Sequence, residues 1–193
     1  IGPERETFPE IELDYIIGSI HFVDNDRGEH LPIDGSVEEF SDTVERGMSG
    51  DIRALVGGYY ESVRYMLNHF QPDILGHIDV IRKNNGGNRF FDPGEAWYRS
   101  EVTATIKDAA RNGCIAEINT GGLARGRDVL YPEPWIVDEF KKRNVRMMVN
   151  SDAHAPEHLG MGYDEAFSML RTAGYTEQWI LQGGSWISVP LRP

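Results

Sequence analysis

The residues of this chain best suited to chemistry are the Asp and the His in the segment NSDAH, residues 150–154. The segment follows residues 145–149, a mostly apolar run that predicts a short buried strand. Asp152 and His154, two residues apart at a strand end, can both turn toward a common mouth, which is where barrel enzymes keep their catalytic groups. This pair alone is weak evidence for a site.

Two further predicted strands end in side chains of the same kind. Residues 13–20 lead to His21, and residues 73–76 lead to His77, with Asp79 two residues later. Imidazole and carboxylate groups are ligands that zinc, manganese and iron accept in proteins. The sequence therefore predicts that groups from three strand ends meet at one metal-binding rim.

Four motifs, SIHF, LGHIDV, EINTGG and NSDAH, occur in this order along the chain. In that order they resemble the PHP (polymerase and histidinol phosphatase) metallohydrolase family, and most of all its histidinol-phosphatase members. The resemblance runs from about Leu13 to Leu191. It implies a distorted β/α (TIM-like) barrel and a phosphomonoesterase that hydrolyses L-histidinol phosphate in histidine biosynthesis. It also implies two or three divalent ions, zinc, manganese or iron, that activate a hydroxide for attack on phosphorus.

The resemblance also assigns roles to particular residues of this chain. The metal ligands would be His21, His77, Asp152 and His154. The catalytic groups would be Asp152, His154, Arg82 and Arg125. The substrate, whose phosphate suits the paired donors of guanidinium groups, would be bound by Arg82, Asn119, Arg125 and Arg127. Arg125 is preferred to Arg127 because the family's loop carries its Arg directly after Leu, where this chain has Ala124.

Other polar residues near these motifs have ordinary structural explanations. Hydrogen-bonded structural roles are predicted for His30, His69 and His158. Asp79 would either hold a ligand imidazole from behind or cap a turn. Glu117 is expected to support Asn119, because residues two apart on a strand share a face.

The elements that must position these groups alternate between strands and helices. Strands are predicted at 13–20, 74–77, 114–118 and 145–149, a loop at 22–34, and helices at 37–40, 51–70, 92–111, 135–143 and 164–173. Every polar motif follows a strand and none precedes one, which is typical of a β/α barrel or a doubly wound sheet. No G-x-G-x-x-G segment follows the first strand, so the barrel is favoured.

The N-terminal residues 1–12 are polar and predict a connection or a surface helix. In the PHP family a His-x-His motif, a further His and a bridging Glu lie upstream of this point. The barrel is therefore expected to be incomplete at its N-terminus, with residues 1–193 as a single domain that forms its C-terminal portion. Its four remaining ligands are expected to bind metal weakly or not at all.

Composition narrows the function classes further. The 193 residues are 40% hydrophobic and 26% charged, as in one globular domain. A formal net charge of −12 argues against nucleic acid as a partner and leaves a small phosphorylated substrate. The single cysteine, Cys114, cannot form an internal disulfide, and no apolar run could cross a bilayer, so no membrane partner and a cytoplasmic location are expected. The oligomeric state stays open.

Three alternative functions remain at this point. The protein could be a phosphoesterase of the same fold that acts on another small phosphate or on a nucleotide. It could be a catalytically inactive barrel module, which would also lack the upstream ligands. It could be a doubly wound nucleotide-binding protein, which the missing glycine motif disfavours.

Overall fold

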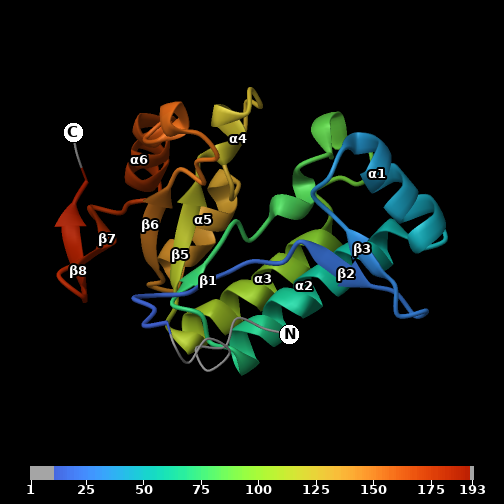
Figure 1. The fold of residues 1–193 in the computed structure, drawn as a ribbon, viewed down its shortest axis with the longest axis horizontal. Helices are drawn as coiled ribbons and strands as arrows, with labels where there is room; N and C mark the ends of the chain where they lie inside the picture. The colour runs from blue at the N-terminus through green and yellow to red at the C-terminus, as the bar shows by residue number, and fades with distance from the viewer. Residues whose placement is uncertain (1–10, 192–193) are drawn as a thin grey trace.

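The computed structural model describes residues 11–191, and its centre is a parallel sheet with helices packed around it (Figure 1). The sheet contains β1 (Ile17–Gly18), β4 (Ile74–Leu75), β5 (Ile115–Asn119) and β6 (Arg146–Asn150). The four strands are hydrogen-bonded in the order β1-β4-β5-β6, and every neighbouring pair is parallel. The predicted α/β class is confirmed. Residues 1–10, part of the predicted N-terminal connection, lie outside the described residues.

The predicted barrel is not found among residues 11–191, because the four parallel strands form an open sheet there. Their order follows the order of the chain and never reverses. A doubly wound sheet changes direction at a switch point, which is where it binds its ligand. The described sheet has no such point, so the doubly wound alternative gains no support from the topology.

Helices cover the sheet, and most begin and end close to the predicted positions. They are α1 (Val37–Asp42), α2 (Ile52–His69), α3 (Ala96–Asn112), α4 (Gly121–Ala124), α5 (Pro134–Lys142) and α6 (Tyr163–Thr172). However, α3 starts at Ala96 and not at residue 92, and α4 was not predicted. Ser36 and Glu39 form a reciprocal capping box at the start of α1. Asp51 caps α2 through the amide of Ala54. Gly113, with φ of 69°, ends α3 in the left-handed conformation.

Short helical turns lie in the connections. They are η2 (Thr43–Gly47), η3 (Val80–Arg82), η4 (Gly86–Asn88) and η5 (Pro156–His158). The turn η3 follows β4 after residues 76–79 and lies at the end of the sheet where the polar motifs are.

Two antiparallel hairpins lie outside the central sheet. The first, β2 (Phe22–Asp24) with β3 (His30–Pro32), occupies the segment predicted to be a loop, so that prediction was wrong. The charged residues between its strands suggested a loop, whereas Val23, only 2% exposed, inserts into the core. The second hairpin, β7 (Glu177–Gln182) with β8 (Ser185–Pro190), lies at the C-terminal side in Figure 1. Its two tryptophans pack on a small buried cluster of Ile74, Ile115 and Met148.

The main core lies between the sheet and the long helices α2 and α3, which run side by side in Figure 1. The predicted stripe of α2 is buried at Leu55, Tyr59, Val63 and Met66. Each such side chain contributes about 1.5–3 kcal/mol when fully buried. No helix among residues 11–191 combines the length and the apolar character needed to span a bilayer.

Candidate active site

A cavity of about 890 Å³ lies at the carboxyl ends of β1, β4, β5 and β6. This volume is in the range that accommodates small-molecule ligands. Eight of the residues singled out from the sequence line it: His21, His77, Glu117, Asn119, Arg125, Arg127, Asp152 and His154. The structure thus brings together side chains separated by up to 133 positions (154 − 21), as the motifs predicted, while their chemical roles remain predictions.

Two imidazoles lie next to each other at one end of the cavity. The ring centroids of His21 and His77 are 5.0 Å apart, with the rings edge to face. His21 Nδ1 is 2.8 Å from Asp34 Oδ2, and this hydrogen bond raises the pKa of His21 although partial burial opposes it. Burial lowers the pKa of His77, whose Nδ1 has no hydrogen-bond partner among residues 11–191. His77 therefore presents a neutral ring with one nitrogen unused.

A buried carboxylate, that of Glu117, joins the ends of β4, β5 and β6 beneath these rings. Glu117, 3% exposed, accepts a hydrogen bond from the His77 backbone amide at 2.7 Å. It also accepts bonds from the side-chain amides of Asn119, at 3.0 Å, and Asn150, at 2.7 Å. With three donors on its two oxygens, the carboxylate is well compensated for burial. Glu117 supports Asn119, as expected, and also fixes the ends of β4 and β6.

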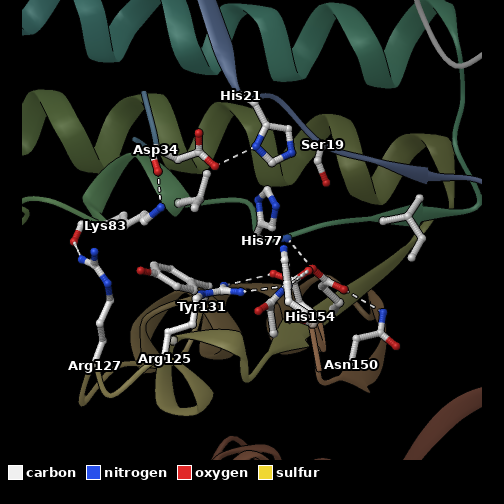
Figure 2. Close-up of a pocket in the computed structure, with 16 residues that line it drawn as sticks. Ser19, His21, Asp34, His77, Lys83, Arg125, Arg127, Tyr131, Asn150 and His154 are labelled. Atoms are coloured by element: carbon white, nitrogen blue, oxygen red, sulfur yellow. Dashed lines mark hydrogen bonds and ion pairs between the residues drawn. The ribbon is translucent and has the colours of Figure 1, made fainter. Parts of the chain in front are cut away.

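The opposite side of the cavity carries Arg125 in contact with the NSDAH segment (Figure 2). Its guanidinium donates to Asp152 Oδ2 at 3.1 Å, and Nη1 lies 3.2 Å from His154 Nδ1. Asp152 has a φ of 48°, a left-handed conformation that is uncommon for residues other than glycine and that Asp adopts more readily than most. A side chain at Gly121 would meet Arg125 Nη2 at 2.6 Å and Asp152 Oδ2 at 3.1 Å. Glycine there leaves room for this contact.

Arg82 does not line the cavity, contrary to its predicted place in substrate binding. Its side chain is 12% exposed and pairs with two acids, Asp79 Oδ2 at 2.7 Å and Glu133 Oε1 at 3.1 Å. Asp79 also accepts from the Glu133 amide at 3.0 Å, so it neither supports an imidazole nor caps η3 through its side chain. Although burial alone would lower the pKa of Arg82, the two carboxylates raise it, which keeps the guanidinium charged and engaged. In this structure Arg82 serves the fold.

The cavity contains several polar residues that the sequence did not single out. They are Ser19, Asp34, Lys83, Tyr131 and Asn150. Lys83 directly follows Arg82 in the polar loop after β4, and that position was the one available signal for it. Asp34 and Tyr131 lie outside the four motifs, and the packing of loops brings them to the site.

The described residues do not complete a metal site. Within residues 11–191 no group of three or more His, Cys, Asp or Glu side chains is arranged to hold an ion. His21 and His77 lie close enough to share a neighbourhood, and the free Nδ1 of His77 has suitable chemistry. Asp152 and His154, however, are both in contact with Arg125. The residues present thus fit a divalent ion only in part.

Comparison with known proteins supports the resemblance seen in the motifs. No family model matches the chain. It is 28% identical over 182 residues to a Deinococcus radiodurans protein named "Probable histidinol-phosphatase", covering 89% of this chain and 61% of the relative. It is 28% identical over 161 residues to the Bacillus subtilis histidinol-phosphatase, covering 80% of this chain and 58% of the relative. The chain thus spans about six tenths of the length of these relatives.

A solved structure shares the fold. The crystal structure of a candidate histidinol phosphatase from Listeria monocytogenes matches with a TM-score of 0.66 and 22% identity. The match covers 83% of this chain and 60% of that one. The chain thus shares the α/β fold of that structure, with the cavity described above at its strand ends. In sequence the chain is similar to proteins named histidinol-phosphatase, in agreement with the resemblance of its four motifs.

Proposed function

We propose that the protein is a metal-dependent phosphomonoesterase that hydrolyses L-histidinol phosphate to histidinol and phosphate. The observation that supports this most directly is one cavity in which cationic side chains face imidazoles and a carboxylate at the strand ends. A phosphate monoester is a dianion, and Arg125 and Arg127 on one wall provide charge and paired hydrogen-bond donors for it. The names of the sequence relatives support the choice of histidinol phosphate and a place in histidine biosynthesis.

In this proposal the residues of the chain bind and orient the substrate. Asn119, which is hydrogen-bonded to Glu117 at 3.0 Å, would contact the phosphate together with Arg125. Arg127 is the second arginine that could do so. The side chains are positioned before substrate arrives, so little reorganisation is needed when charge develops on the phosphate oxygens. Arg82 has no part in this contact, because its guanidinium is paired with Asp79 and Glu133.

Divalent ions, zinc, manganese or iron, belong to the proposal as cofactors. A bound ion would act as a Lewis acid and lower the pKa of a bound water. This chain would contribute His21, His77, Asp152 and His154. Because the described residues fit an ion only in part, the role proposed for them is substrate binding and no later step of the reaction. A distorted barrel that contains the open sheet is proposed together with this function.

The test is a direct assay of phosphate release from L-histidinol phosphate, with manganese, zinc or iron added and with EDTA as the matched control. The same assay with a nucleoside monophosphate and another small phosphate ester separates the alternative substrates. We expect metal-dependent release that is fastest with L-histidinol phosphate. Faster release from another ester would change the substrate, and no release from any ester by metal-loaded protein would favour the inactive module.

A further inference from the structure

We propose that Lys83 and the Tyr131 hydroxyl, together with Arg127, form the anion subsite of the cavity and bind the phosphate of a monoester dianion. The proposal assigns to Lys83 the role in phosphate binding that the sequence suggested for Arg82. It rests on the proposed function for the identity of the ester. The existence of an anion subsite rests on the geometry alone.

Lys83 and Arg127 are cations without an acidic partner. Neither forms an ion pair with a carboxylate in the part of the chain that the structure describes, residues 11–191. Lys83 Nζ donates to the backbone carbonyl of Asp34, whose carboxylate is bonded to His21. Arg127 Nη1 donates to the Lys83 carbonyl at 2.8 Å, which fixes the two residues next to each other. Two adjacent cations thus face the cavity with donors to spare.

Two neighbouring cations without an ion-paired carboxylate are unusual in a chain of this composition. The protein has 31 acidic and 19 basic residues, so carboxylates are abundant. Arg82, one residue before Lys83, has two of them. Burial lowers the pKa of Lys83, and the charges of Arg127 and Arg125 lower it further, whereas Asp34 and Asp152 oppose the shift. Arg125 is paired with Asp152, but Lys83 and Arg127 repel each other on this wall, and an anion bound between them would relieve the repulsion.

Tyr131 adds a neutral donor to the same wall. Its side chain is 3% exposed, lines the cavity, and has a hydroxyl with no partner among the described residues. In Figure 2 this hydroxyl points toward the side of the cavity where Lys83 and Arg127 lie. A side chain at Gly122 would lie 3.3 Å from the Tyr131 ring, so the loop packs tightly against it. A buried hydroxyl without a partner is costly unless a ligand provides one.

The experiment measures binding of inorganic phosphate to the protein by isothermal titration calorimetry, without added metal. Lys83→Met should weaken binding about tenfold or more, because it removes a charge-assisted hydrogen bond. Lys83→Arg should retain most of the affinity, and Tyr131→Phe should weaken binding about threefold or more. Lys107→Met, on α3 and outside this cavity, is the matched control and should bind phosphate as the parent does.

Two outcomes would overturn the subsite: a parent protein that binds no phosphate, or a Lys83→Met variant that binds it as tightly as the parent. Thermal unfolding of each variant establishes that it is folded. If Lys83→Met does not fold, Lys83→Gln is measured in its place. The proposed function fails separately. If phosphate binding depends on Lys83 but L-histidinol phosphate is not hydrolysed, the anion subsite stands and the assigned reaction does not.

Discussion

Two buried tyrosine hydroxyls in this protein differ in one respect that stability measurements can detect. The Tyr175 hydroxyl donates to the Val145 carbonyl at 2.9 Å, whereas the Tyr131 hydroxyl has no partner among residues 11–191. Tyr175→Phe should lower the free energy of unfolding by about 1 kcal/mol, because it leaves a carbonyl unpaired. Tyr131→Phe should leave it unchanged or raise it by about 1 kcal/mol. Urea unfolding of both variants measures the difference.

The Tyr131 result bears on the anion subsite. Retained stability together with weakened phosphate binding is the pattern of a residue kept for a ligand. A Tyr131→Phe variant that is clearly less stable than the parent would instead show that the hydroxyl is hydrogen-bonded within the folded protein.

A second prediction at the residue scale concerns Arg125, because its guanidinium contacts two of the proposed metal ligands, Asp152 and His154. An ion that binds Asp152 and His154 must displace the guanidinium from its bonds at 3.1 and 3.2 Å. Arg125→Ala should therefore bind manganese or zinc more tightly than the parent, by about tenfold for the loss of one charged competitor. Calorimetric titration with the metal alone is the measurement, and Arg127→Ala is the control. Equal affinities in all three proteins would contradict the prediction.

The sequence predicted some residues of the cavity much better than others. His21, His77, Asp152 and His154 each follow a predicted strand within a recognisable motif, so their convergence could be expected. Lys83 and Tyr131 carry no such signal. Arg82 and Lys83 are neighbours with the same charge, and only the positions of Asp79 and Glu133 decide which of them faces the cavity.

At the scale of elements, a buried ion-pair cluster joins the turn η3 after β4 to the start of α5. Asp79, fully buried, bonds the Arg82 side chain and the Glu133 amide. Asp79→Ala would leave the Arg82 charge buried beside one remaining acid, and should cost about 3–5 kcal/mol. Chemical denaturation measures this loss.

An exposed ion pair provides the control for that measurement. Asp42 and Arg46 lie 3.6 Å apart, and both side chains are largely exposed to solvent. Asp42→Ala should change the free energy of unfolding by less than about 1 kcal/mol. If Asp79→Ala were as mild as Asp42→Ala, the cluster would not be what fixes the loop that carries Lys83.

Five of the six α-helices among residues 11–191 were predicted because their signals are local, whereas α4 was missed. The capping box of Ser36 and Glu39, the Asp51 cap and Gly113 act within a few residues, so the sequence contains them. The strands were harder to predict. The predicted strand at 13–20 is only Ile17–Gly18 in the sheet, and the hairpin β2–β3 occupies a predicted loop. Strand pairing depends on partners distant in the chain, which periodicity does not reveal.

At the scale of the whole molecule, the sequence predicted the α/β class but not how far the sheet closes. The β-loop-α rhythm is the same in a barrel and in an open sheet, because both place helices between parallel strands. Closure depends on which strands pair at the edges. The four-stranded order β1-β4-β5-β6, with the hairpin β7–β8 beyond, became known only from the structure.

The buried core also predicts how stability depends on alkaline pH. Burial raises the pKa of the Cys114 thiol to about 12, and burial likewise raises the pKa values of Tyr98 and Tyr175. In the unfolded chain these groups lose their protons near their ordinary values, about 8.5 for Cys and about 10 for Tyr. Their contribution to stability is therefore complete below about pH 8.5 and is lost as the pH rises toward the folded values.

The expected outcome is a free energy of unfolding that falls steadily above about pH 9. Urea unfolding at pH 7, 9 and 10 measures it, at constant ionic strength. Cys114→Ala should remove the earliest part of the decline, because no thiol is then left to ionise in the unfolded chain. In the folded parent the buried thiol should also resist a thiol reagent at pH 8 and react once urea unfolds the chain. Constant stability across this range, or rapid labelling of the folded protein, would mean that solvent reaches Cys114 and that the core around it is less closed than the structure shows.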